Sequence, residues 1–378
     1  MPPMRDHRSA AVGLVAALVA FPIVSASAQS NLVPIREELR IGGEAADFTR
    51  VLWLGVSRNG TIIISQPMDG NLRVYDATGR LLKVLGRAGG GPGEFGSIGL
   101  SGWTGDSLWV HDGSLGRISY VRADATLGEP RPVPSVPSAA LPKDLVGVVT
   151  GTAPSALYPD GSTLYKLTAR QPPSADGNFG RREAYWLVDG NGVARQAVLG
   201  RVGEPCTVLF EGGALFKPFC RETLLRESPD GMHLAAIDQL NDSTVYVVMM
   251  RRDGSELWRR RVSSVPTCMT RAAWDSIIAT RTKLRLSPPA HAAWTGLTAP
   301  PRFPPLRSAL IGRDGSVWIE GWGKNVRPWT VLRPDGSTLG RLNLPGPAKL
   351  AVADLKQIWT IELDQDDLPS IVRYRLGK

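Results

Sequence analysis

The stretch Leu85–Ser97 reads LGRAGGGPGEFGS and packs six glycines and one proline into thirteen residues. It contains G-x-G-x-x-G at Gly91, Gly93 and Gly96, which is the spacing of a dinucleotide-binding loop. Such a loop must open a helix, yet the residues that follow, SIGLSGWTGDSLWVHDG, have no apolar face of helical period. A Walker-type phosphate loop also needs Gly-Lys-Ser/Thr, which is missing here. The stretch therefore predicts a structural corner rather than a phosphate site.

A short turn recurs along the chain, and each copy precedes a run with strand character. The copies are Arg58-Asn59-Gly60, Pro159-Asp160-Gly161, Pro229-Asp230-Gly231 and Arg313-Asp314-Gly315, with the variant Thr104-Gly105-Asp106. A second turn follows four of these, beginning at Asp76, Asp189, Asp253 and Asp335. Asn-Gly and Asp-Gly favour tight hairpins because these residues tolerate positive φ.

The repeat predicts six four-stranded antiparallel meanders, which together form an all-β, six-bladed β-propeller. The six units are Phe48–Leu85, Ile98–Pro132, Leu145–Leu199, Leu224–Val262, Leu306–Leu344 and Ala348–Leu376. The last unit shows only three strand-like runs, and we expect the N-terminal segment Leu32–Ile41 to supply the fourth strand and close the ring. One helical pattern, Arg271–Arg285, predicts a short insertion between the fourth and fifth units.

Three segments carry a resemblance to a known group of proteins. GRAGGGPGEF, at Gly86–Phe95, resembles the G-x-G-x-GPGEF signature of bacterial six-bladed β-propellers related to NHL-repeat and TolB-like proteins. Pro301–Trp322 and Pro328–Pro345 are similar to the fifth-blade entry and the closing hairpin of the same group. The resemblance supports the fold, but it says little about activity, because propellers host unrelated functions.

On this interpretation the glycine stretch carries the chain from the outer strand of one blade to the inner strand of the next. Gly91 and Gly93 allow unusual backbone angles, and Pro92 stiffens the corner. We expect Phe95 to fill the space between blades, and Glu94 either to accept backbone N–H bonds or to face the channel.

The N-terminus has the pattern of a secretory signal peptide, residues 1–28, followed by a single propeller domain, residues 29–378. Arg5 and Arg8 precede the apolar run Ala10–Val24, and Ala26-Ser27-Ala28 fits a cleavage site. We therefore expect a secreted or periplasmic monomer with no transmembrane segment after cleavage. Removal of residues 1–28 leaves a net charge of +8 from +9. The charge is scattered, so we expect no nucleic-acid partner.

The three cysteines, Cys206, Cys220 and Cys268, permit one disulfide in an oxidising compartment. Three single pairings are open, and the short separation favours Cys206 with Cys220.

The loops predict which face of the propeller binds. Turns between first and second strands are uniformly short, whereas the opposite face receives the long segments Thr168–Arg182, Pro130–Lys143, Val202–Arg221 and Pro266–Pro305. Long loops on a rigid scaffold usually carry binding, so we expect the ligand at the channel mouth on this long-loop face. The alternative is that these segments are lineage-specific decoration.

Two sets of candidate site residues lie at the long-loop face. Asp112, Asp238, Glu320 and Asp364 recur near the ends of second strands, and a ring of such carboxylates suits Ca²⁺. Loop capping or salt bridging explains Asp112 and Asp364 equally well. Trp322, Asn325, Arg327 and Trp329 flank one loop and have the chemistry to stack on a sugar or hold an acidic ligand; packing between blades is the alternative.

No catalytic residue can be assigned, since the chain has no G-x-S-x-G or H-E-x-x-H motif. The sequence therefore favours a binding or interaction module for a protein, peptide or carbohydrate, with no required cofactor. The alternative is a lactonase- or lyase-type propeller enzyme that holds a metal such as Ca²⁺ in its channel, and a structural envelope protein is a third class.

Overall fold

In the computed structural model, which describes residues 32–43, 46–134, 136, 149–170, 181–199, 206–283, 285–323 and 325–377, the strands form six four-stranded antiparallel sheets. The first three are β2 (Leu54–Val56), β3 (Ile62–Gln66), β4 (Asn71–Tyr75) and β5 (Leu81–Leu85); β6 (Ile98–Thr104), β7 (Ser107–Asp112), β8 (Arg117–Val121) and β9 (Arg131–Pro132); and β10 (Val149–Leu157), β11 (Thr163–Arg170), β12 (Arg181–Val188) and β13 (Ala194–Leu199). The fourth and fifth are β16 (Leu224–Glu227), β17 (His233–Asn241), β18 (Thr244–Arg251) and β19 (Glu256–Ser263); and β20 (Ser308–Ile311), β21 (Val317–Glu320), β22 (Val326–Leu332) and β23 (Thr338–Pro345). The sixth joins β24 (Lys349–Ala353), β25 (Gln357–Leu363) and β26 (Pro369–Leu376) to the N-terminal strand β1 (Ile35–Ile41).

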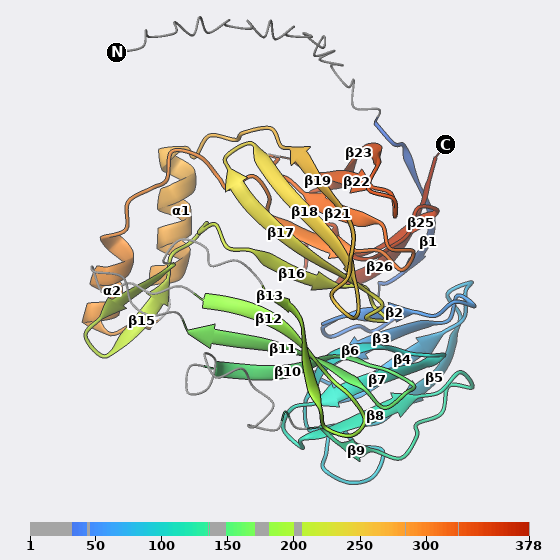
Figure 1. Ribbon diagram of the computed structural model, residues 1–378. Coiled ribbons are helices and arrows are strands. Elements are labelled where there is room, and N and C mark those ends of the chain that lie inside the picture. Colours follow the sequence, from blue (N-terminus) through green and yellow to red (C-terminus); the bar gives the residue numbers. More distant parts are fainter. Residues whose placement is uncertain are drawn as a thin grey trace, which may run out of the picture. The chain divides into compact units, whose positions relative to one another are not determined.

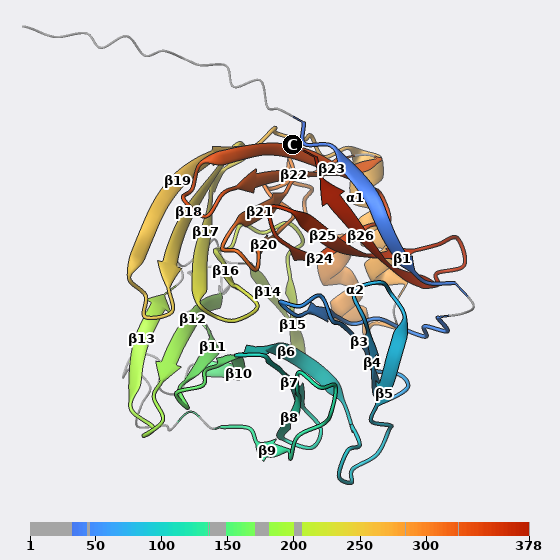
Figure 2. The same cartoon turned by 90° about the vertical axis from the view of Figure 1, so that its right-hand side faces the viewer.

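The sheets are arranged around an axis, with the first strand of each sheet innermost. Inner strands of different sheets contact one another, β6 with β10, β16 with β20, and β2 with β24. Figure 2 looks along the axis and shows β5, β9, β13, β19 and β1 on the outside. Residues 31–378 form one unit, and the predicted six-bladed β-propeller is confirmed.

The sheets are held together by apolar side chains that alternate between the two faces of each strand. In β3, Ile62 and Ile64 pack in a cluster with Trp359 of the sixth sheet, while Ile63 packs with Val110 of the second sheet. Successive side chains of a strand point to opposite faces, so a strand between two neighbouring sheets is apolar on both. This explains why β3 is buried at every position.

The glycine stretch joins β5, the outer strand of the first sheet, to β6, the inner strand of the second. Phe95 is 2% exposed and packs in the cluster that contains Leu85 and Val110, so it fills the space between the first two sheets. Glu94 accepts the backbone N–H of Gly91 at 2.8 Å. Gly93 has φ +72°, a value that few other residues adopt readily. Gly91 and Pro92 form the intervening turn of this corner.

The N-terminal strand occupies the outer position of the last sheet. β1 pairs antiparallel with β26, from Ile35 opposite Leu376 to Ile41 opposite Ile371. The side chain of Glu38 adds an ion pair with Arg375, at 2.7 Å. Strand pairing between the two ends of the chain therefore completes the four strands of this sheet.

The insertion between β19 and β20 contains two helices rather than the one predicted. α1 (Arg271–Thr282) matches the expected helical pattern, and α2 (Pro288–Thr295) follows it. Ser287 caps α2, and the two prolines occupy its first positions, where a missing N–H costs no helical hydrogen bond.

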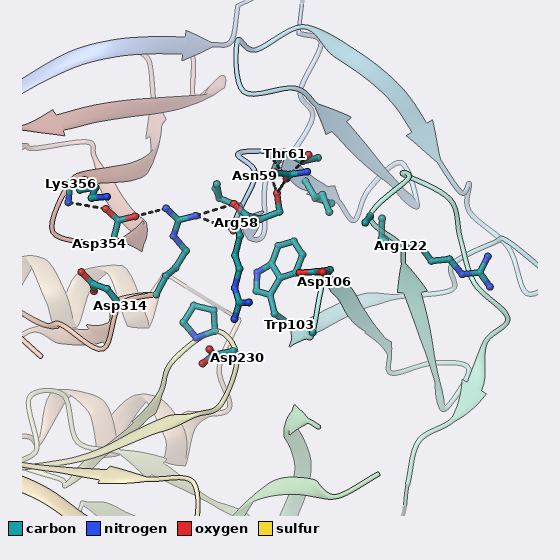
Figure 3. A pocket seen from close by; sticks show the side chains of 18 of the residues that line it. Arg58, Asn59, Thr61, Trp103, Asp106, Arg122, Asp230, Asp314, Asp354 and Lys356 are labelled. Atoms are coloured by element: carbon teal, nitrogen blue, oxygen red, sulfur yellow. Dashed lines mark hydrogen bonds and ion pairs between the residues drawn. The ribbon is translucent and has the colours of Figure 1, made fainter. Parts of the chain in front are cut away.

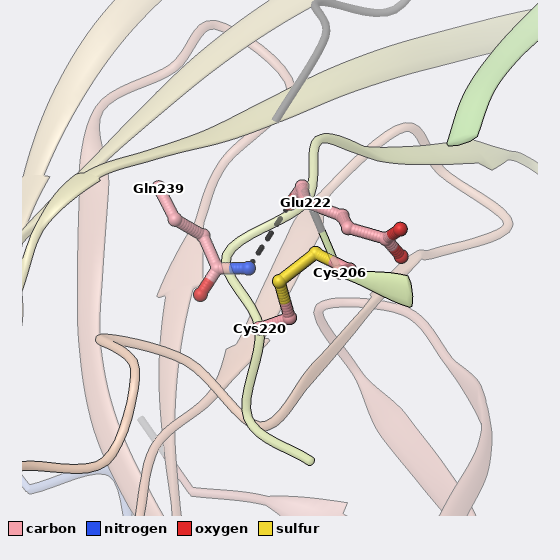
Figure 4. The surroundings of a disulfide bond; sticks show 4 residues. All are labelled: Cys206, Cys220, Glu222 and Gln239. Atoms are coloured by element: carbon pink, nitrogen blue, oxygen red, sulfur yellow. Dashed lines mark hydrogen bonds between the residues drawn. A yellow bond between two sulfur atoms is a disulfide. The ribbon is translucent and has the colours of Figure 1, made fainter. Parts of the chain in front are cut away.

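A second unpredicted element is the hairpin of β14 (Thr207–Phe210) and β15 (Gly213–Phe216), which precedes the fourth sheet. Cys206 and Cys220 form a disulfide across its base, with Cα atoms 5.6 Å apart (Figure 4). Cys268 is free and exposed. The hairpin contacts α2, and Figure 1 shows both helices and β15 together at one end of the propeller.

Several expectations lie outside the described residues, namely the signal peptide, residues 1–28, and most of the loops 130–143 and 168–182. Within the described part of the chain, no helix is long and apolar enough to cross a membrane.

Candidate functional site

The short turns that define the sequence repeat are built by side chains that bond to their own backbone. Asp230 accepts the backbone N–H of Met232 at 3.1 Å, and Asp314 accepts that of Ser316 at the same distance. Glycine follows each of these carboxylates in the left-handed region, with φ +69° at Gly231. This pattern favours a tight turn of fixed shape, so each hairpin between first and second strands is short and rigid.

A cavity of about 680 Å³ lies where these turns converge. In every sheet except the third, the turn between the first and second strands, or a strand next to that turn, lines the cavity. The turn between β8 and β9 of the second sheet also contributes. The contributing residues include Ser57–Asn59, Trp103, Asp106, Arg122, Pro229, Asp230, Arg313, Asp314 and Asp354–Lys356 (Figure 3). The volume falls within the usual range of small-molecule sites, about 300–1,000 Å³.

One wall of the cavity is locked by Arg313. Its guanidinium donates to the backbone carbonyls of Val56 and Ser57, each at 3.2 Å, and pairs with the carboxylate of Asp354. Asp314 accepts the backbone N–H of Leu355 at 2.8 Å. These contacts tie the first turns of the fifth, sixth and first sheets to one another, so this part of the lining is preformed.

A backbone hydrogen bond between the second and fourth sheets fixes another wall of the cavity. The N–H of Trp103, at the end of β6, donates to the carbonyl of Pro229 at 2.8 Å. The hydroxyl of Tyr158 in the third sheet donates to the carbonyl of Gly231 at 2.7 Å, and burial raises the pKa of Tyr158. The turn of the third sheet thus packs behind the Asp230 turn, which accounts for its absence from the lining.

Three polar groups of the lining take no part in these contacts. Among the described residues, neither the guanidinium of Arg58 nor the carboxylate of Asp106 forms a hydrogen bond or ion pair, and the indole N–H of Trp103 has no acceptor. Figure 3 shows Arg58 extending past the indole in the direction of Asp230, whereas the side chain of Arg122 points away from the other labelled residues. Val56, Ile63 and Val121 supply apolar surface beside them.

This cavity is on the face opposite to the one we expected. β7 runs from the turn at Asp106 to Asp112, so Asp112 and the other predicted carboxylates lie a strand length away from the short turns. The described long segments, which are the β14–β15 hairpin and the two helices, pack on one another at the far face. We refer to the β14–β15 hairpin and the two helices, which contact one another, as the cap.

The four predicted metal ligands each have local partners. Asp112 is fully buried and accepts the backbone N–H groups of Gly96 and Ser97, at 2.8 and 3.0 Å. Asp364 is exposed and caps its own turn by accepting the N–H of Asp366 at 2.9 Å.

The other two carboxylates are buried within their own sheets. Asp238 accepts the hydroxyl of Thr223 at 2.6 Å, and Glu320 pairs with Arg327 at 2.9 Å. Among the residues the structure describes, no three His, Cys, Asp or Glu side chains gather closely enough to hold a metal ion. Asp112, Asp238, Glu320 and Asp364 therefore do not form one cluster.

The predicted aromatic site is largely used for packing. Trp329 is 2% exposed within the core, and Asn325 is exposed at the start of β22. Trp322 stacks on Phe303 with ring centres 4.4 Å apart, and Phe219 meets both rings edge-on. The three rings join the disulfide hairpin to the helical insertion and the fifth sheet.

Arg327 also has a protein partner in this region, because its Nη1 donates to the carbonyl of Ala348 at 2.5 Å. Burial lowers the pKa of its guanidinium. Trp322 and Arg327 thus contact protein rather than open space. Sequence reasoning missed Arg58, Trp103 and Asp106, although the first and last lie in the turns that define the repeat.

Comparison with known proteins places the chain by fold. No protein-family model and no curated protein matches it. Among solved structures it is similar to a member of the DUF4221 family from Bacteroides vulgatus, with 10% identity, 93% of this chain and 100% of that chain covered, and a TM-score of 0.52. The chain is a six-bladed β-propeller.

Weaker similarities extend to propellers of other functions. A catalytically inactive virginiamycin B lyase from Staphylococcus aureus shares 13% identity over 91% of this chain and 100% of that chain, with a TM-score of 0.41. The calcium-binding protein regucalcin from Agrobacterium tumefaciens shares 12% identity over 90% and 96%, with a TM-score of 0.38. Similarities this distant carry no conclusion about activity.

Proposed function

We propose that the mature chain is an exported binding protein that takes a small ligand in the cavity among its short turns. The observation that carries this proposal is the convergence of turns from five sheets on a single cavity of about 680 Å³. Arg313 and the contact between Trp103 and Pro229 fix the walls before any ligand arrives. A preformed site costs less to order on binding, which favours affinity.

Export rests on the sequence of residues 1–28, whose basic start, apolar run and small-residue cleavage site are those of a signal peptide. The disulfide between Cys206 and Cys220 is of the kind that persists outside the cytoplasm. We therefore propose a secreted or periplasmic location, with the protein acting as a monomer.

A metal-dependent lactonase or lyase is not favoured by any specific observation. The carboxylates that such an enzyme would need are engaged with their own sheets, and the cavity lies at the other face. We propose binding without catalysis and without a metal cofactor.

The experiment is a thermal-shift screen of the mature protein, residues 29–378, against amino acids, short peptides, sugars and nucleosides. Any compound that stabilises the wild type is then tested on Ala123→Trp, which adds a large side chain to an exposed turn position in the cavity lining. The matched control is Ala279→Trp, the same substitution at an exposed position of α1.

A ligand of this cavity stabilises the wild type and the control but not Ala123→Trp, because only a bound ligand raises the melting temperature. The proposal fails if no compound shifts the wild type, or if Ala123→Trp responds as strongly as the control does.

A further inference from the structure

The charge of the cavity restricts the chemistry of its ligand, an inference that rests on the proposed function. The lining carries four aspartates, Asp106, Asp230, Asp314 and Asp354, and four cations, Arg58, Arg122, Arg313 and Lys356. The two signs balance, so the site as a whole does not select a ligand with a large charge of one sign.

Several of these charges are already satisfied within the protein. Arg313 and Asp354 pair with each other, and Asp314 accepts the backbone N–H groups of Ser316 and Leu355. Arg122 points away from the other labelled lining residues (Figure 3). Apart from Arg122, the charged groups of the lining that remain without a partner among the described residues are the guanidinium of Arg58, the ammonium of Lys356, the carboxylate of Asp106 and one carboxylate oxygen of Asp230.

These opposite charges share one cavity but do not neutralise each other. Among the described residues, Arg58 forms no ion pair, and only one oxygen of Asp230, Oδ1, accepts hydrogen bonds, from Ser228 and Met232. The contact between Trp103 and Pro229 holds the Asp106 and Asp230 turns against each other on one side. The cavity therefore offers a cationic position and an anionic position that are separated by more than ion-pair distance.

We propose that the ligand is a short peptide, of about tripeptide size, whose two termini are free. Its carboxylate would accept bonds from Arg58, because the planar guanidinium fork matches the two oxygens of a carboxylate. Its ammonium group would donate to Asp106 and Asp230. A side chain of the peptide would lie against the indole of Trp103, which is half-buried in the lining.

The size of the cavity supports a peptide over a single amino acid. A volume of about 680 Å³ suits a drug-sized molecule, and one amino acid would leave most of that space to water. A neutral sugar would fill the space and stack on Trp103, but its hydroxyls would give the separated charges no partner of opposite charge.

The test is equilibrium dialysis of the mature protein against three mixtures, with mass spectrometry of both chambers. The mixtures are combinatorial tripeptides with free termini, the same tripeptides acetylated and amidated at their ends, and neutral trisaccharides. We expect free tripeptides to accumulate with the protein, and the blocked mixture to accumulate about tenfold less or weaker still, because hydrogen bonds to charged groups are lost.

Variants then assign the contacts. Arg58→Ala is expected to weaken binding about tenfold or more, while Arg50→Ala, which removes the same charge from an exposed position outside the cavity lining, leaves it unchanged. Asp230→Asn removes the negative charge but keeps the oxygen that caps the turn, as Asn59 does in the equivalent turn of the first sheet. It should weaken binding of free tripeptides without lowering the melting temperature.

The outcomes separate this inference from the proposed function. If trisaccharides accumulate and Ala123→Trp abolishes that accumulation, the cavity binds a ligand but the peptide assignment is overturned. Equal accumulation of free and blocked tripeptides, or equal binding by Arg58→Ala and Arg50→Ala, overturns the role of the termini. If none of the three mixtures accumulates but another compound of the thermal-shift screen stabilises the wild type and not Ala123→Trp, only the peptide assignment is overturned; if no compound stabilises the wild type either, both proposals fail.

Discussion

The side chain of Phe95 offers the sharpest test of how the blades are joined. Phe95 is 2% exposed and packs with residues of the first and second sheets, including Leu85 and Val110. Replacing a buried phenylalanine by alanine removes that apolar contact and leaves a cavity, at a cost of about 3–5 kcal/mol in the free energy of unfolding. Phe95→Ala should therefore be one of the most destabilising single substitutions in the chain.

The expected shift in melting temperature follows from the size of the domain. An unfolding entropy of about 2.1 cal/mol/K per residue gives about 0.7 kcal/mol/K for the unit formed by residues 31–378. The loss of 3–5 kcal/mol then lowers the melting temperature by about 4–7 °C. Differential scanning calorimetry of the mature protein measures this shift directly.

The matched control is Leu82→Ala, in the outer strand β5 just before the glycine stretch. Leu82 is 48% exposed, so its truncation should change stability by no more than about 0.5 kcal/mol. If Phe95→Ala and Leu82→Ala shift the melting temperature equally, Phe95 does not fill the space between the sheets and the account of this corner is wrong.

Three further predictions concern the corner, the cap and the turns. Gly86→Ala should destabilise the same corner, because Gly86 has φ +81° and an added Cβ would lie 2.5 Å from the ring of Phe95; a melting temperature equal to that of wild type would contradict this. The double substitution Cys206→Ser with Cys220→Ser removes the cross-link over a sequence separation of 14 residues and should lower the free energy of unfolding by about 3 kcal/mol in urea titrations. An unchanged free energy would show that the cap does not unfold together with the sheets. The pKa of Asp76 is held at about 2, chiefly by the hydroxyl of Thr78, and that of Asp160 is also about 2, chiefly through the hydroxyl of Ser162. Both pKa values lie below the unfolded value of about 3.9, so the stabilisation is present above pH 4 and is lost as the pH falls towards 2. In Asp76→Asn the melting temperature should fall less between pH 4 and pH 2 than it does in the wild type. An equal fall in both proteins would rule out this contribution.

The sequence was sufficient for the fold because its signals are local. Asn59-Gly60 and Asp230-Gly231 specify tight turns by their own backbone preferences, and strands such as β3 show the apolar content of a sheet packed on both faces. The glycine stretch could be assigned to a corner because no helix follows it.

Some local elements were nevertheless missed. The hairpin β14–β15 has a Gly212-Gly213 turn between apolar runs, a signal that could have been used. The helix α2 was obscured by Pro288 and Pro289, which interrupt helices internally but suit their first turn.

The cavity could not be located from the sequence in the same way. Arg58, Trp103, Asp230 and Lys356 are far apart along the chain and meet only because the propeller closes on itself. Loop length points to the other face, where the β14–β15 hairpin and the two helices pack on each other. A carboxylate is available to a ligand only if the protein's own donors do not occupy it. The hydrogen bonds that occupy Asp112, from the backbone N–H groups of Gly96 and Ser97, are not visible in a single sequence.

The binding-protein account also makes a prediction about metals. Because the four predicted carboxylates do not converge, neither EDTA nor added Ca²⁺ should change the melting temperature of the mature protein. A reversible rise with Ca²⁺ would instead support a metal site and justify a screen for lactonase activity.

The central claim is that the ligand binds among the short turns rather than on the long-loop face. The most direct measurement is a crystal structure of the mature protein with a ligand retained in dialysis. The account predicts ligand density between Arg58 and Trp103, beside Asp106 and Asp230. Density over Trp322 and Asn325, with the short-turn cavity filled only by water, would contradict it.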